Sequence, residues 1–155
     1  MKKLVLILAL LFSTFFSSAA FAQQQFRGSV KFICGKTDDA SVKAFAFAAG
    51  LYSTTINVTN QNTGNVSGQK RFSIALLAQK PGPFSPLINW ALKPNESMQI
   101  DCGDIYTRMN IVPGTFIDGF VHIVGAPVRF DVTAVYTVSD GERPVSIDVD
   151  AITLR

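Results

Sequence analysis

The chain has 155 residues, 48% of them hydrophobic and 16% charged, which suits one domain with a hydrophobic core and excludes an intrinsically disordered polyelectrolyte. The formal net charge of +3 falls to about +1 without Lys2 and Lys3, because 12 cations then stand against 11 acids. The chain therefore lacks the excess of basic residues typical of nucleic-acid binding, and we predict no nucleic-acid partner.

The N-terminus has the pattern of a signal peptide. Lys2 and Lys3 form a positive start, an apolar run covers residues 4–12, and Ala20-Phe21-Ala22 fits the small-x-small rule for signal peptidase. A transmembrane anchor is the alternative, but a spanning helix needs about 20 apolar residues, and the polar residue Gln23 follows at once.

These observations predict a cleavable signal peptide over residues 1–22 and a single domain over residues 23–155. The protein is then secreted or periplasmic, with no stable membrane span after cleavage. Such compartments are oxidising, which makes the cysteines informative.

Cys34 and Cys102 are the two cysteines of the chain, and each lies at the inward phase of a strand-like segment. An oxidising compartment favours their pairing. The bridge would close a loop of about 69 residues and contribute roughly 4 kcal/mol in the chain-entropy model. Two distant cysteines and one histidine do not make a zinc site, which uses four ligands in close pairs. We predict a structural disulfide, no metal and no cofactor.

Alternation of apolar and polar residues predicts the strands. The period of two is clearest in four segments, and four shorter candidates lie between turn clusters rich in Gly, Pro and Asn. In chain order, the eight segments are 26–34, 54–60, 72–78, 87–92, 97–102, 116–124, 128–138 and 145–149. No amphipathic helix is evident. We therefore predict an all-β, antiparallel two-sheet β-sandwich of immunoglobulin-like type, with about eight strands; a closed barrel is the alternative.

Residues 42–51 depart from this pattern, because they are apolar on both phases except at Lys43. They fit either an exposed segment that binds a partner or a segment buried on both sides. If exposed, the candidate contact residues are aromatic or aliphatic anchors: Phe45, Phe47, Leu51 and Tyr52. The proline-rich residues 81–86 are expected to form a rigid connecting loop.

Residues that could support catalysis are sparse. His122 is the one histidine, and it lies within a strand beside Val121 and Ile123. A general base also needs a placed nucleophile and an orienting group, so His122 is expected to be structural. The acids are nine Asp and two Glu, and the pair Asp148 and Asp150 provides too few oxygens for Ca²⁺ without further ligands. We predict a non-enzymatic protein; an enzyme with an unrecognised site remains an alternative.

Four segments of the sequence carry a resemblance: Tyr52 to Asn60, Leu92 to Ile105, Phe116 to Ile123 and Asp131 to Thr137. Together they resemble small exported bacterial β-sandwich proteins of uncharacterised function. This resemblance covers most of the chain after the signal peptide and implies an exported β-sandwich without implying an activity.

The segment Gly28 to Cys34, with the sequence GSVKFIC, is similar to the first strand of chaperone–usher pilins, where a disulfide also begins. Those pilins end in an alternating strand with an aromatic residue next to last, whereas this sequence ends Ile152-Thr153-Leu154-Arg155. The sequence thus predicts an exported surface, structural or binding component with a protein partner or self-association. The alternative is a subunit of a pilus-like fibre formed by strand addition.

Overall fold

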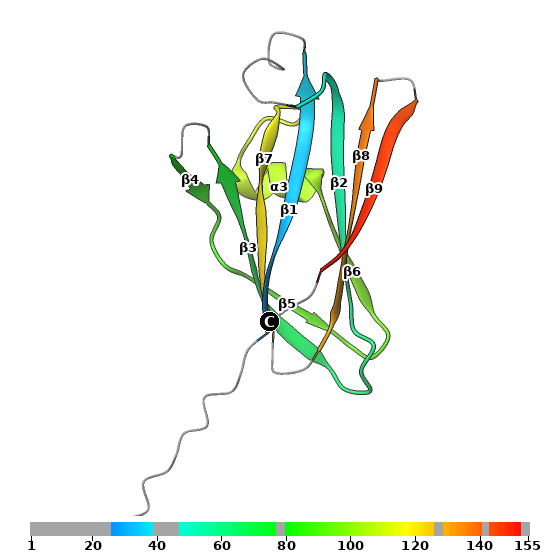
Figure 1. The fold of residues 1–155 in the computed structure, drawn as a ribbon. Coiled ribbons are helices and arrows are strands. Elements are labelled where there is room, and N and C mark those ends of the chain that lie inside the picture. The colour runs from blue at the N-terminus through cyan, green and yellow to red at the C-terminus, as the bar shows by residue number, and fades with distance from the viewer. Residues whose placement is uncertain (1–25, 39–46, 77–79, 126–128, 141–142, 153–155) are drawn as a thin grey trace, which may run out of the picture.

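The computed structural model describes residues 26–38, 47–76, 80–125, 129–140 and 143–152 (Figure 1). The predicted signal peptide and Phe45 lie outside these residues. Among the helices that are described, none has the length and apolar character needed to cross a membrane.

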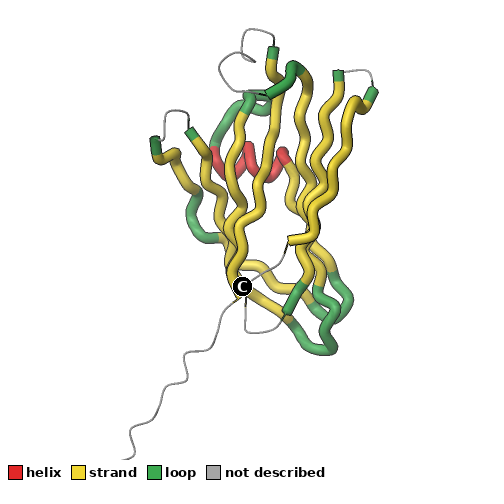
Figure 2. The backbone as a smooth tube through the Cα atoms, viewed as in Figure 1, coloured by secondary structure: helices red, strands yellow, loops and turns green. Residues whose placement is uncertain are grey.

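Nine strands and one short helix make up the described fold, which confirms the predicted all-β class (Figures 1 and 2). In chain order they are β1 (Phe26–Thr37), β2 (Gly50–Thr59), β3 (Val66–Ala75), β4 (Pro81–Phe84), β5 (Ile88–Leu92), β6 (Ser97–Asp101), α3 (Cys102–Met109), β7 (Ile117–Gly125), β8 (Asp131–Ser139) and β9 (Pro144–Ile152).

All strand pairs are antiparallel, in the order β4-β3-β7-β1-β2-β8-β9, with β5 also on β3 and β6 also on β2. β1 joins two groups of strands, because residues 26–34 pair with β7 and residues 35–37 pair with β2. We call β1, β3, β4, β5 and β7 the β7 half, and β2, β6, β8 and β9 the β8 half.

The change of partner along β1 occurs at a glycine. Gly35 has a φ of 93°, a backbone conformation that side chains disfavour. A Cβ atom there would also collide with the carbonyl group of Thr115. Glycine thus lets β1 leave β7 and continue along β2.

Inward-facing side chains of both halves form one buried cluster. The predicted alternation holds in β1 and β7, whose inward residues are fully or almost fully buried. The β7 half contributes Val30, Phe32, Phe72, Val121 and Ile123; the β8 half contributes Ile56, Val58, Ile100, Val132 and Ala134; α3 adds Ile105 and Tyr106.

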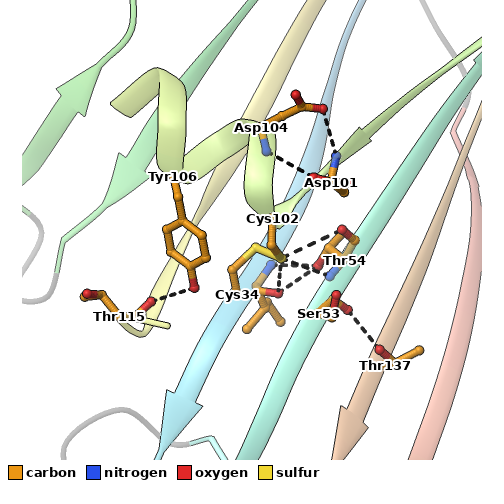
Figure 3. The surroundings of a disulfide bond; sticks show 10 residues. Cys34, Ser53, Thr54, Asp101, Cys102, Asp104, Tyr106, Thr115 and Thr137 are labelled. Carbon is orange, nitrogen blue, oxygen red and sulfur yellow. Dashed lines mark hydrogen bonds between the residues drawn. A yellow bond between two sulfur atoms is a disulfide. The ribbon is translucent and has the colours of Figure 1, made fainter. Parts of the chain in front are cut away.

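The predicted disulfide is confirmed. Cys34 of β1 and Cys102 at the start of α3 are bonded, with 5.7 Å between their Cα atoms (Figure 3). Thr54 of β2 lies beside the bridge, where its hydroxyl accepts from the Ile33 amide and donates to the Ile33 carbonyl, both at 2.9 Å. The bridge and Thr54 therefore tie β1, β2 and α3 together.

The expectation that no helix is present is wrong, because residues 102–109 form α3. Asp101 caps its N-terminus in a reciprocal capping box with Asp104 (Figure 3). Asn110 ends the helix in the left-handed conformation. Capping satisfies amide groups that the first turn leaves unpaired. Burial of Ile105 and Tyr106 attaches this eight-residue helix to the core.

The proline-rich loop prediction is wrong over residues 81–84, which form β4. This strand pairs with β3, with Phe84 opposite Ser73, and it lies at the end of the strand order. Proline is tolerated on such an edge strand because the missing amide faces away from the ladder.

The predicted half-burial of β9 is also wrong. Ile147 and Val149 are 61% and 58% exposed. Asp148 pairs with Tyr136, and Val149 pairs with Val135. Since paired residues share a face, this register puts the carboxylates on the face of Tyr136 and the apolar side chains on the opposite, outer face.

Candidate functional site

The outward side of the β7 half brings together residues from four strands. Strand register places Ser29, His122 and Arg71 in one row across β1, β7 and β3. The adjacent row runs across β1, β7, β3 and β4. Its members are Lys31, Phe120, Ser73 and Phe84. We call these seven residues the ring–cation face.

His122 is held at the centre of this face by two serines. Its Nδ1 lies 2.8 Å from the Ser29 hydroxyl, and its Nε2 lies 2.8 Å from the Ser73 hydroxyl. A neutral imidazole donates from one nitrogen and accepts at the other, so both hydroxyls can bond it. Burial, followed by the charge of Arg71, lowers the pKa of His122 below its ordinary value. Both effects favour the neutral form of the ring.

Cations alternate with aromatic rings around His122. The Lys31 ammonium lies 5.5 Å from the centre of the Phe120 ring, and the Arg71 guanidinium lies 5.3 Å from that of Phe84. Phe84 is 67% exposed and Phe120 is 37% exposed. Lys31 also pairs with Asp118 at 2.7 Å. The face thus presents rings and positive charge to solvent together.

A hollow of about 520 Å³ opens on this face beside His122. Its polar lining comes from β1, β3 and β7, and Leu87, which precedes β5, adds an apolar wall. The described residues that line it are neutral or cationic: Arg27, Gly28, Ser29, Gln69, Arg71, Leu87, His122, Ile123 and Val124.

The structure places the predicted contact residues of the described part of the chain in two different surroundings. Phe47 and Tyr52 pack edge to face with each other and with Phe116, with ring centres 5.2–5.9 Å apart, and both are half-buried. Leu51 points the other way from β2 and is 45% exposed. Phe47 also reaches the ring–cation face, because the Lys31 ammonium lies 6.0 Å from its ring.

The acidic residues that lie close together in the sequence either cap a helix or are exposed to solvent. Asp101 and Asp104 cap α3, and Asp148 and Asp150 are exposed on β9. Within the described ranges, no group of three or more His, Cys, Asp or Glu side chains is placed to hold a metal ion.

Sequence reasoning singled out His122 but missed the residues around it. Ser29 lies 93 positions from His122, and Ser73 lies 49 positions from it. Alternation could have placed all three on outward strand phases, but only strand pairing brings them together.

No protein-family model matches this chain, and no curated protein or solved structure shows significant similarity to it.

Proposed function

We propose that this protein is an exported, non-enzymatic binding component that contacts a protein partner through the ring–cation face. The observation that carries this proposal is the solvent-facing arrangement of Lys31, His122 and Arg71 among the rings of Phe84 and Phe120. Aromatic residues and arginine are enriched where proteins bind one another, because they combine apolar area with directed polar contacts.

The proposal includes a two-layer, immunoglobulin-like sandwich as the scaffold. A single buried cluster with residues from both halves supports this arrangement, as does the sharing of β1 between β7 and β2. Export is supported by the signal-peptide pattern of residues 1–22 and by the Cys34–Cys102 disulfide, since disulfides persist in oxidising compartments.

A binding role fits His122 better than a catalytic one. Ser29 and His122 are within the reach of a nucleophile and its base. In serine hydrolases, however, a carboxylate holds the other imidazole nitrogen and stabilises the imidazolium. Here the Ser73 hydroxyl takes that position, and nearby Arg71 disfavours a positive charge on the ring.

Site-specific photo-crosslinking in the producing cell tests the binding face. A photoreactive residue at Phe120 should give a discrete adduct, because its side chain is solvent-facing within the ring–cation face. Gln99 is the matched control, since it is exposed on the outer face of the β8 half, opposite Asn57. Equal adducts at both positions, or none at Phe120, would contradict the proposal.

Assembly by strand addition is a second candidate, favoured by β9. This strand pairs with β8 and ends the strand order, while Ile147 and Val149 are exposed on it. An edge strand with apolar side chains can template a further strand. Light scattering during size exclusion should then give a multimeric mass that Val149→Lys reduces to the monomer. A monomeric native protein across micromolar to millimolar concentrations would remove this candidate.

A further inference from the structure

The hollow beside His122 has the chemistry of a site for a negatively charged group. Arg27 and Arg71 contribute two guanidinium groups to its lining, and Ser29 and Gln69 contribute neutral polar groups. Asp118, the ion-pair partner of Lys31 at 2.7 Å, is not among the described residues that line the hollow. The described lining of the hollow thus carries cationic groups and no carboxylate.

Guanidinium groups bind carboxylates and phosphates well, because their planar donors match two oxygens of one such group. Arg71 is exposed, so its donors can reach a ligand in the hollow. His122, which is held by Ser29 and Ser73, adds a further polar group to the lining of the hollow.

The hollow also offers more surface than a lone anion can use. Its volume of about 520 Å³ far exceeds one carboxylate, and its wall includes Leu87, which is 56% exposed. Phe84, which packs on Arg71, is 67% exposed next to the same charge. A peptide that carries an acidic side chain beside an apolar one would use both the charge and the apolar area.

We propose that the hollow binds a carboxylate side chain from an acidic segment of the protein partner, with Arg71 as its principal ligand and with apolar contact to Leu87. This inference rests on the proposed binding function and adds the chemistry of the partner.

The test is an NMR titration of the full exported protein with its disulfide intact. The probe is the capped peptide Ser-Glu-Leu-Glu-Ser, and the matched control peptide carries Gln in place of Glu. The acidic peptide should shift the side-chain signals of Arg71 and His122, while the control peptide should leave them unchanged.

Arg71→Gln should weaken binding of the acidic peptide at least about tenfold, as expected for loss of a charge-assisted pair. Lys36→Gln removes an equal charge from an exposed site outside the hollow. This control should change the affinity for the acidic peptide less than about twofold.

Further arms distinguish the source of the carboxylate. Free glutarate and inorganic phosphate should bind more weakly than the peptide, because neither makes the apolar contact. The inference would be overturned if either small anion bound as tightly as the peptide or more tightly. It would also be overturned if polygalacturonate, an acidic polysaccharide, bound more tightly than the peptide, or if Arg71→Gln left the affinity for the peptide unchanged. If the titration fails while the Phe120 crosslink persists, the carboxylate site is wrong and the binding face stands. If the peptide binds but Phe120 gives no adduct, the wider partner interface is wrong instead.

Discussion

His122 lies between two serine hydroxyls on the solvent side of β7, and this position determines how it titrates. Burial and the charge of Arg71 lower its pKa in the folded protein, whereas the unfolded chain has the ordinary value of about 6.5. As pH falls through that value, the unfolded state takes up the proton first, so acid favours unfolding. Because of this imidazole, the protein loses stability as the pH falls from about 7 to the lowered pKa of His122 in the folded state.

We predict that the urea midpoint of the native protein falls from pH 7.5 to pH 5, and that His122→Gln falls less over the same interval. Comparison of the two proteins cancels the titration of the carboxylates that they share. A steeper fall in the variant would mean that the folded protein stabilises protonated His122, which contradicts the lowered pKa.

Trp90 is a second residue whose surroundings predict a measurable change in the free energy of unfolding. Its indole N–H is buried with no hydrogen-bond partner among the described residues, and its ring packs edge to face on Phe130 at 5.2 Å. We predict that Trp90→Phe lowers stability by less than about 1.5 kcal/mol, because loss of apolar contact is offset by removal of an unpaired donor.

Chemical unfolding should measure this change beside Phe72→Ala, a fully buried ring whose loss should cost about 3–5 kcal/mol. If Trp90→Phe costs as much as Phe72→Ala, removal of the unpaired indole N–H does not offset the lost apolar contact.

At the scale of elements, the disulfide is the cross-link whose effect can be measured separately. It connects β1 to the start of α3 across 68 positions of sequence. We predict that Cys102→Ala lowers the free energy of unfolding by about 2–5 kcal/mol. Reduction of the native protein should give a similar loss, and reduction of the variant should add nothing. A variant as stable as the oxidised native protein would show that the bridge adds no stability.

The elements also show where sequence reasoning succeeds and where it fails. Alternation predicted β1 and β7 well, because each has buried residues on one face. It failed for β9, since a period of two identifies two faces without saying which one meets the core. It missed α3 because a helix of eight residues shows little periodicity, although Asp101 and Asp104 already carried a capping spacing.

The candidate site was harder still to predict from the sequence. Ser29, Arg71 and His122 come from three strands, and their adjacency follows from the pairing of β1 with β7 and of β7 with β3. Residue types and spacing along the chain do not contain this pairing. Of the predicted contact residues in the described part of the chain, Phe47 borders the face through Lys31, while Leu51 lies on the other half.

For the whole molecule, the proposed export determines the redox setting and the mature N-terminus. The small-x-small sequence Ala20-Phe21-Ala22 predicts cleavage before Gln23. We predict that Edman degradation or mass spectrometry of the exported product begins at Gln23 or its pyroglutamate form. A soluble exported product that retains Met1 would contradict the proposed signal peptide.

The ring–cation face links the fold to the proposed function, because strand pairing alone brings its residues together from β1, β3, β4 and β7. If charge and rings act together there, removal of the charges must weaken capture at a ring. The decisive measurement is the yield of the photo-crosslink from Phe120 in the native background and in the Lys31→Gln/Arg71→Gln double variant. We predict a discrete adduct in the native background and at least about a tenfold loss in the double variant. An adduct of undiminished yield in the correctly folded double variant would contradict binding through this face.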